Sequence, residues 1–337
     1  MDFLRKILFP LAFLYWLITF IRNWLYDKGI FKSSSFNIPI IAVGNLSVGG
    51  TGKTPQIEYL IRLLSENYKV AVLSRGYKRT TEGFILADEK ATASSIGDEP
   101  FQFYSKFPNI QVAVDANRKN GIENLLQLSN KPDVILLDDA YQHRKVKAGF
   151  YILLTAYDDL FCDDYILPFG NLREPSSGKK RADMIIVTKC PNDLSEIAQQ
   201  KIREKLKVKQ PVFFTTIQYD DYVFGNDSQL LVSEIQSESK VLVAGIAKPK
   251  LFFDFLKNEK DDTLVFPDHH HFSKQDCEQI LAKAKGRKII TTEKDFVRLN
   301  GLLPKAQLFY LPIKSAFLNT NIDKTIEDYV GQSTRNS

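Results

Sequence analysis

"IPIIAVGNLSVGGTGKT", residues 38–54, leads from an apolar run through a cluster of glycines into the start of a helical pattern. A strand, a glycine loop and a helix start form the arrangement in which backbone N–H groups surround phosphate oxygens. A lysine then reaches the terminal phosphates and a threonine hydroxyl binds Mg²⁺. Ser47 stands where the usual pattern begins with glycine. The stretch predicts a site for a nucleoside triphosphate with Mg²⁺ rather than a plain glycine turn, and its residues are Gly49, Gly50, Thr51, Gly52, Lys53 and Thr54.

Short apolar runs recur along the chain, with helical stretches between them. They lie at residues 39–43, 70–73, 83–87, 110–114, 134–137, 151–154, 184–188 and 212–217. Alternating strands and helices predict a parallel sheet covered on both faces. Residues 218–238 contain a "GND" turn between two short runs and predict a hairpin. Four more strand candidates follow, at 240–249, 262–268, 287–295 and 307–313.

The predicted fold class is therefore α/β, with a P-loop NTPase-type sheet and a smaller α/β unit. We expect a membrane-associated N-terminal helix at residues 1–32 and a P-loop domain at 33–217. A hairpin linker at 218–238 and a smaller domain at 239–330 complete the expected organisation.

Two acidic pairs accompany the loop. Asp138 and Asp139 end the buried run "DVILLDD", and a phosphate loop needs an acid at such a position to hold its magnesium. Asp98 and Glu99, in "GDEP", lie at the head of a helical stretch, where acids are also common as caps. Because phosphoryl transfer to a hydroxyl needs a carboxylate that accepts the proton, Asp98 or Glu99 is the candidate base.

Further polar side chains follow strands of the same predicted sheet, at the edge where open α/β sheets bind ligands. They are Arg75, Arg118, Gln142, His143, Arg173 and Glu174. Several arginines at that edge suit anionic groups, although any one of them could equally be a surface charge. In the second predicted domain, "PDHHHF" at 267–272 has three adjacent histidines, which point in different directions and so argue against a three-histidine metal site. We expect one of them to face the cleft between the domains.

The amino terminus is unusually apolar. Residues 7–21, "ILFPLAFLYWLITFI", are shorter than the roughly 20 residues that span a bilayer as a helix, and basic residues flank both ends. Aromatic rings in and after this run favour a helix that lies in the membrane interface. A helix packed on the protein's own core and a single membrane span remain alternatives.

Composition restricts the partners of the chain. The 337 residues carry a net charge of +5 without an arginine-rich or lysine-rich run, so nucleic acid is not an expected partner. The three cysteines, Cys162, Cys190 and Cys277, lack the spacing of a zinc site or a disulfide framework. Nothing in the sequence indicates an obligate protein partner.

Two other classes of protein share a phosphate loop followed by a strand acid. A switch GTPase or metal-insertion chaperone is one, but "VTKCPND" has Pro191 where the base-reading motif of GTPases needs an acid. A kinase of a soluble metabolite is the other. Neither class needs fifteen apolar residues at its start, so both leave the N-terminal run unexplained.

Taken together, the motifs resemble those of one family, the tetraacyldisaccharide 4'-kinases of lipid A biosynthesis. The matching segments run in family order from residue 1 to residue 295: the hydrophobic amino terminus, "VGNLSVGGTGKTP", "SRGYKR", "GDEP", "NRKNG", "DDAYQHR", "LPFGNLREP", "PDHHHF" and "TTEKD". The resemblance implies that ATP phosphorylates the 4'-hydroxyl of a tetraacylated glucosamine disaccharide 1-phosphate, a lipid A precursor. It also implies that the enzyme acts at the cytoplasmic face of the bacterial inner membrane. The fold that it implies has two α/β/α domains joined by a two-stranded linker.

The resemblance also implies roles for individual residues. Asp98 matches the family's general base, and a histidine of the 267–272 run, for which we choose His269, matches the partner of that base. Residues matched to the loop lysine and the metal site are Lys53, Thr54, Glu99 and Asp138. Residues matched to the surroundings of substrate and nucleotide are Asp139, Arg118, His143, Arg173 and Glu174.

Overall fold

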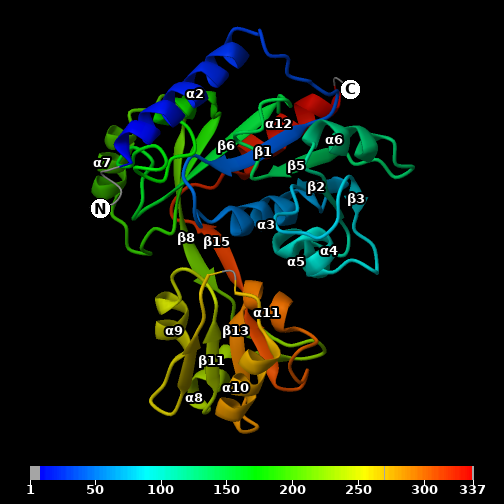
Figure 1. The fold of residues 1–337 in the computed structure, drawn as a ribbon, viewed down its shortest axis with the longest axis vertical. Helices are drawn as coiled ribbons and strands as arrows, with labels where there is room; N and C mark the ends of the chain where they lie inside the picture. Colours follow the sequence, from blue (N-terminus) through cyan, green and yellow to red (C-terminus); the bar gives the residue numbers. More distant parts are fainter. Residues whose placement is uncertain (1–7, 269, 336–337) are drawn as a thin grey trace.

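Two β-sheets organise the chain. The computed structural model describes residues 8–268 and 270–335, and Figure 1 shows a nine-stranded sheet above a six-stranded one. We call the nine-stranded sheet with its covering helices the larger domain, and the six-stranded sheet with its helices the smaller domain.

The larger sheet is parallel except at its edges. Its strands are β1 (Ile40–Asn45), β2 (Val70–Ser74), β3 (Ile85–Leu86), β4 (Gln111–Val114), β5 (Val134–Asp138), β6 (Phe150–Ala156), β7 (Met184–Thr188), β8 (Val212–Tyr219) and β15 (Ile313–Phe317). They are ordered β15-β8-β7-β6-β1-β5-β2-β4-β3, with β3 and β15 antiparallel to their neighbours. The eight strands expected before residue 218 all form, which confirms the α/β fold class.

Helices cover both faces of this sheet. They are α3 (Lys53–Leu64), α4 (Ala93–Ile96), α5 (Asp98–Lys106), α6 (Arg118–Leu126), the 3₁₀ helix η1 (Ser176–Arg181), α7 (Glu196–Leu206) and α12 (Asp323–Arg335). Successive β1 residues point to opposite faces: Ile41 packs in a core with Ile57 of α3, and Ile40 in another with Ile122 of α6. A strand buried on both sides explains why its sequence is apolar throughout.

The smaller sheet is formed mainly from the last third of the chain. Its order is β10-β9-β14-β13-β11-β12, with β9 (Tyr222–Phe224), β10 (Gln229–Leu231), β11 (Val241–Ala244), β12 (Asp262–Val265), β13 (Ile289–Thr292) and β14 (Leu308–Leu311). Its helices are α8 (Val232–Ser237), α9 (Lys250–Leu256), α10 (Lys274–Ala284) and α11 (Glu293–Leu299).

The connection between the domains differs from the expected hairpin at 218–238. That hairpin forms from β9 and β10, but β9 pairs with β14 and so belongs to the smaller sheet. The antiparallel pair β8 and β15 runs between the two domains instead, as Figure 1 shows. The chain then returns to the larger domain, because Ile322, Ile326 and Val330 repeat at helical spacing and are buried in its core. The smaller domain thus ends before β15 rather than at residue 330.

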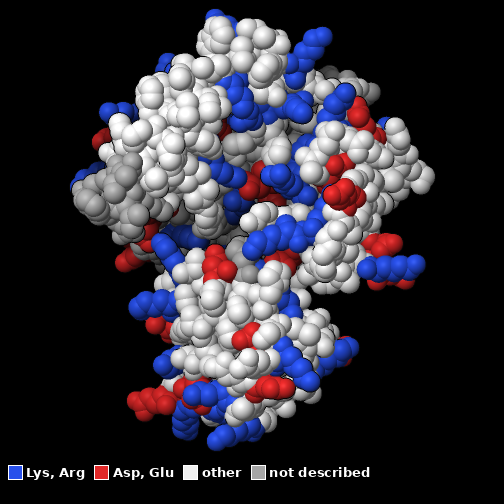
Figure 2. Space-filling model, in the orientation of Figure 1, with Lys and Arg blue, Asp and Glu red and all other residues white. Residues whose placement is uncertain are grey.

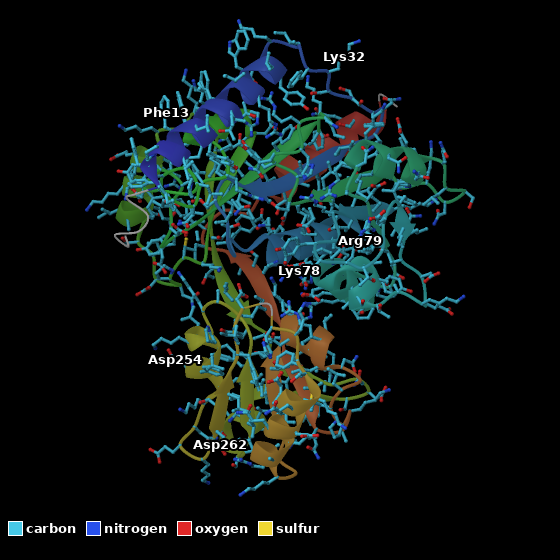
Figure 3. All side chains as sticks on the ribbon, in the orientation of Figure 1. Phe13, Lys32, Lys78, Arg79, Asp254 and Asp262 are labelled. Carbon is cyan, nitrogen blue, oxygen red and sulfur yellow. The ribbon has the colours of Figure 1, made fainter. Side chains whose placement is uncertain are left out.

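The first described helix, α2 (Phe9–Asp27), lies on the outside of the larger domain (Figure 1). Only Ala12 and Thr19 are buried along it. Its exposed apolar side chains are Phe9, Leu11, Phe13, Leu14, Trp16, Leu17, Ile18, Phe20, Ile21 and Trp24; Phe13, for example, points away from the protein in Figure 3. Within the described residues, no helix combines the length and the apolar character that crossing a membrane requires.

Candidate active site

The phosphate loop follows β1, the central strand of the larger sheet, and leads into α3. Gly49 and Gly52 have φ angles of 108° and 81°, in the left-handed region where a side chain would be strained. Gly52 is also the N-cap residue of α3, directly before Lys53. The loop therefore directs backbone N–H groups and the positive end of α3 towards one point, as phosphate binding requires.

The end of β7 holds this loop in place. The Thr188 hydroxyl donates a hydrogen bond to the Thr51 carbonyl at 2.8 Å, and the Lys189 ammonium donates one to the Gly50 carbonyl at 2.5 Å. Burial, together with nearby lysines of both domains, lowers the pKa of Lys189. The "VTK" segment thus supports the phosphate loop, a role that the sequence alone did not indicate.

Lys53 and Asp139 belong to a polar network at the end of β1. The Lys53 ammonium lies 3.2 Å from the Asn45 side-chain oxygen and 3.8 Å from the Asp139 carboxylate. Arg173 donates to both oxygens of Asp139, at 3.1 and 2.8 Å. Burial opposes ionisation of Asp139, but Lys53 and Arg173 outweigh it and lower its pKa to about 2. Asp139 is therefore ionised at neutral pH and orients two cations.

The neighbouring Asp138 has the opposite shift. Burial, followed by the charges of Asp139 and Glu99, raises its pKa to about 6. Lys53 and the Ser74 hydroxyl, which donates a hydrogen bond of 2.9 Å, act in the opposite direction and lower this pKa. Acids from β5 and α5 thus face one another, an arrangement that a divalent cation would balance.

These residues fit Mg²⁺. No cluster of three or more metal-ligating side chains occurs in the described part of the chain. Mg²⁺ does not need one, because it binds through one or two carboxylates, waters and substrate phosphates. Asp138, Glu99 and the Thr54 hydroxyl would supply the protein's share, and the bound ion would neutralise charge on the phosphates.

Asp98 and Glu99 begin α5 and face the smaller domain. The Arg298 Nε of α11 donates to Asp98 Oδ2 at 2.9 Å, and Arg298 Nη2 contacts the same oxygen. The Lys294 ammonium of α11 lies 3.1 Å from Glu99. Figure 2 shows this face of the molecule hollowed above the smaller domain, with acidic and basic side chains around the hollow. The candidate base therefore lies where the two domains meet.

Arg118 and His143 lie close to the strand acids. Arg118 is buried and donates to the carbonyls of Asp115 and Asp138, at 2.6 and 3.0 Å, and burial lowers its pKa to about 10. Burial, followed by the charges of Arg118 and Arg75, lowers the pKa of His143 to about 4. His143 is therefore neutral at pH 7 and acts as a hydrogen-bonding group rather than a cation.

Gln142 and Glu174 connect this site with α2. Gln142 donates to the Asn45 carbonyl and to Glu174, both at 2.9 Å. Glu174 is 1% exposed and also accepts hydrogen bonds from Arg181, at 2.7 Å, and from Asn23 of α2, at 2.7 Å. Glu174 thus lies beneath the site as the centre of a buried polar network.

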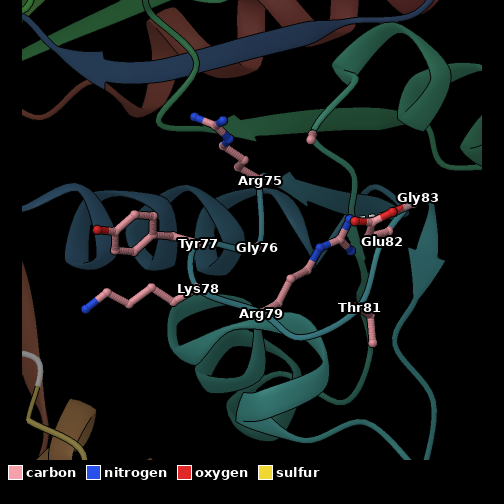
Figure 4. A pocket seen from close by; sticks show the side chains of 9 residues that line it. Arg75, Gly76, Tyr77, Lys78, Arg79, Thr81, Glu82 and Gly83 are labelled. Carbon is pink, nitrogen blue, oxygen red and sulfur yellow. Dashed lines mark hydrogen bonds between the residues drawn. The ribbon is translucent and has the colours of Figure 1, made fainter.

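A cavity of about 490 Å³ opens beside the carboxyl end of β2. Arg75, Tyr77, Lys78 and Arg79 line it together with Glu82. In Figure 4 the Arg75 side chain points towards a neighbouring strand, whereas Lys78 and Tyr77 extend in another direction. Arg79 has a structural contact, because its guanidinium group donates a hydrogen bond to the Gly83 carbonyl at 2.6 Å. The wall of the cavity thus carries three basic side chains against one acid.

The histidine chosen as partner of the base, His269, lies outside the described residues. Its neighbour His270 is described: its Nε2 lies 3.0 Å from Asp276, and its ring stacks on Phe266 with centroids 5.0 Å apart. His271 is exposed. The role of His269 stays a prediction.

Comparison with known proteins decides the family. The family model for tetraacyldisaccharide-1-P 4'-kinase (LpxK) matches residues 4–330. The chain belongs to this family. A tetraacyldisaccharide 4'-kinase of Flavobacterium johnsoniae is 65% identical over 337 residues, covering 99% of both chains. Another, of Bacteroides thetaiotaomicron, is 45% identical and covers 99% of this chain and 95% of its own.

A solved structure supports the same assignment. The crystal structure of the "apo" form of LpxK from Aquifex aeolicus, in complex with ATP, is similar to this chain with a TM-score of 0.78 and 30% identity. The match covers 98% of this chain and 99% of that one. The resemblance stated from the sequence motifs is thereby confirmed.

The LpxK fold brings most of the predicted residues together at one edge of the larger sheet. Sequence reasoning missed Asn45, Ser74 and Arg298. Asn45 and Ser74 are each the last residue of a strand that leads to the site, so a polar residue after an apolar run could have indicated them. Arg298 follows "TTEKD" in a different domain, and nothing local to it indicates contact with Asp98.

Proposed function

We propose that this edge of the larger sheet carries out the phosphoryl transfer of the LpxK family, with the roles set out below. As a member of that family, the chain is an ATP-dependent kinase with an alcohol acceptor, the tetraacyldisaccharide 1-phosphate of lipid A biosynthesis. The observation that carries the proposal is the convergence of the phosphate loop, the strand acids and the acids of α5 at one edge of the larger sheet.

The triphosphate binds at the loop. Residues 49–52 surround its oxygens with backbone N–H groups, and Lys53 reaches the terminal phosphates. Asp139 and Asn45 hold the Lys53 ammonium in position before ATP arrives. This pre-organisation favours catalysis because the charged groups need little rearrangement during the reaction.

Asp98 acts on the acceptor. Its carboxylate takes the proton as the sugar 4'-oxygen attacks the γ-phosphorus in line, and His269 supports it from the smaller domain. Because the contacts of Asp98 come from α11, the completed site depends on how the two domains lie relative to one another.

The anionic sugar meets the basic side chains around the same edge. Arg75 and Arg118 carry positive charge, neutral His143 offers a hydrogen bond, and Arg173 is already oriented by Asp139. Gln142 and Glu174 complete this substrate region, with Glu174 acting through the partners that it positions. Arginine suits such a place because its planar group binds phosphate through two nitrogens.

One experiment tests the activity and the base together. The purified chain is incubated with radiolabelled ATP, Mg²⁺ and a purified tetraacylated disaccharide 1-phosphate, with a soluble sugar as the negative acceptor. We expect label in the lipid only, and Asp98→Asn to lower kcat by about 10³-fold with little change in the KM for ATP. The matched control is Asp88→Asn, at an exposed carboxylate of the same domain. Near-normal turnover of Asp98→Asn would remove Asp98 from the base role.

For α2 we propose a position in the membrane interface, at the cytoplasmic face of the bacterial inner membrane. The support is its run of exposed apolar side chains beside few buried ones. Partial burial of such a set in lipid, at about 1 kcal/mol for each side chain, would give on the order of 10 kcal/mol. The acceptor lipid would then lie next to the site, because α2 contacts Glu174 and Arg173 through Asn23 and Tyr15.

Vesicle sedimentation tests this position. The double variant Leu14→Glu, Ile18→Glu places two charges on one side of α2, at side chains that are 53% and 57% exposed. We expect it to stay in the supernatant, whereas the parent and the control Leu251→Glu, at an exposed side chain of α9, sediment with the vesicles. Unchanged sedimentation of the double variant would count against the interface position.

A further inference from the structure

Helices α5 and α11 carry complementary charges along the contact between the domains. At the start of α5, Asp98 and Glu99 meet Arg298 and Lys294 of α11. At the end of α5, Lys106 meets Glu293 at the start of α11. The acids at the start of α5 and the lysine at its end thus each meet an opposite charge on α11.

Arg298 is the most firmly held of these residues. Its side chain is 6% exposed, compared with 33% for Lys294. Behind it lies Asp295, which is 0% exposed and 3.5 Å from Arg298 Nη1. Asp295 accepts hydrogen bonds from the Gly245 amide, at 2.8 Å, and from the Thr292 hydroxyl, at 2.7 Å. The guanidinium group is therefore fixed by the body of the smaller domain.

Gly245, whose amide binds Asp295, lies next to the Pro267 carbonyl at the start of the "PDHHHF" stretch. A Cβ added at Gly245 would lie 3.0 Å from Asp295 Oδ1 and 3.3 Å from the Pro267 carbonyl. Glycine at residue 245 therefore leaves room for both Asp295 and the Pro267 carbonyl beside the end of β11. One buried carboxylate thus holds both Arg298 and the Gly245 amide that follows β11, and Gly245 in turn lies beside the Pro267 carbonyl.

The contact with Asp98 has a specific geometry. Arg298 Nε and Nη2 both meet Oδ2, so one oxygen of the carboxylate is held by two nitrogens of a rigid fork. Such a contact fixes the rotation of the carboxyl group and keeps Oδ1 in a defined direction. A base that must meet a sugar hydroxyl at hydrogen-bonding distance gains from that restriction.

We propose that Arg298 is a positioning residue for the phosphoryl transfer, which orients the Asp98 carboxylate from the smaller domain. The inference rests on the role of Asp98 as base given above. Arg298 itself acts through Asp98. In this role the smaller domain sets the direction in which the base points.

The test separates orientation from stability. In Arg298→Ala we expect kcat to fall by about 100-fold, the cost of a misplaced reacting group, while the KM for ATP stays within about threefold because the phosphate loop is untouched. Arg298→Lys keeps the charge but loses the fork, and we expect a fall of about 10-fold. Added guanidinium ion should restore part of the activity of Arg298→Ala. The matched control, Lys288→Met, removes an ion pair of the same domain and should stay within about twofold of the parent.

The other possible results of these assays would contradict the positioning role of Arg298 or the base role of Asp98. A kcat of Arg298→Ala equal to or above that of the parent overturns the proposal, and so does a rise confined to the KM for ATP. If both Arg298 variants lose activity together with melting temperature and guanidinium restores none, the role is structural and the proposal is again overturned. Asp98→Asn is assayed alongside: if it remains active, the base assignment fails, whereas an inactive Asp98→Asn with an active Arg298→Ala counts against Arg298 alone.

Discussion

The two halves of the active site are held in different ways. The phosphate-loop half is fixed within the larger domain, by Thr188, Lys189, Asn45 and Asp139 acting on neighbouring strands and the loop. The half that carries Asp98 and Glu99 is held from outside, by ion pairs with α11 of the smaller domain. The difference indicates that the phosphate loop is held within one domain, while the proposed base is held by contacts with both.

The largest effect should come from the pre-formed half. Lys53→Met removes the cation that Asp139 and Asn45 hold ready, so we expect phosphoryl transfer to fall by about 10³-fold while the fold is retained. Steady-state transfer to the lipid acceptor and a melting curve measure the two properties. Lys119→Met, in an exposed pair with Glu123, is the control. A change of less than about tenfold for Lys53→Met would show that the loop does not work through this cation.

A smaller effect on catalysis should follow when the phosphate loop loses a hydrogen bond but no charge is removed. Thr188→Val deletes the hydroxyl that donates to the Thr51 carbonyl but keeps the shape of the side chain. Loss of one hydrogen bond of about 1 kcal/mol predicts a rise of about fivefold in the KM for ATP, with kcat less affected. Thr263→Val, in β12 of the smaller domain, serves as control. If kcat fell and KM did not, the loop would be limiting chemistry rather than binding.

The contact between the halves is tested through stability rather than through activity. Glu293 of α11 is buried, and burial, reinforced by Glu58 and opposed by Lys106, raises its pKa from 4.5 to about 7. Folding therefore binds a proton between these pH values, so the free energy of unfolding falls as pH rises through the interval. Glu293→Gln should remove this loss and gain about 3 kcal/mol at most relative to the parent between pH 5 and 8.

Melting curves of the parent and Glu293→Gln at pH 5 and 8 measure that gain. Glu238→Gln, at a half-exposed carboxylate of the smaller domain, is the control and should show no such pH dependence. A constant difference between the parent and Glu293→Gln across this range would mean that Glu293 does not bind the proton.

Much of the larger domain was predictable because its signals are local. The run at residues 38–54 contains the strand, the glycines and the lysine in order, and each feature has a direct physical cause. Asp138 was predictable as well, since it ends an apolar run that only a buried strand explains. Local patterns of this kind identify which residues reach the ligand-binding edge of a sheet.

The rest could not be read from the sequence because it depends on contacts between distant segments. Arg298 meets Asp98 across 200 positions, and no periodicity near either residue indicates the pairing. The opposite pKa shifts of the neighbours Asp138 and Asp139 also come from tertiary contacts. Burial, followed by the charges of Asp139 and Glu99, raises the pKa of Asp138, whereas Lys53 and Arg173 lower that of Asp139. The hairpin at 218–238 was recognised, but its partner strand lies some eighty residues later, at Tyr310 opposite Phe224.

The antiparallel pair β8 and β15 has one more consequence. The chain leaves the larger domain along β8 and re-enters it along β15, so the smaller domain is an insertion tethered at both ends. When the charged contacts of α11 open, that helix cannot diffuse away, and its return is an intramolecular event with a high effective concentration. Tethering at both ends therefore keeps α11 close to α5 even when an individual ion pair between them breaks.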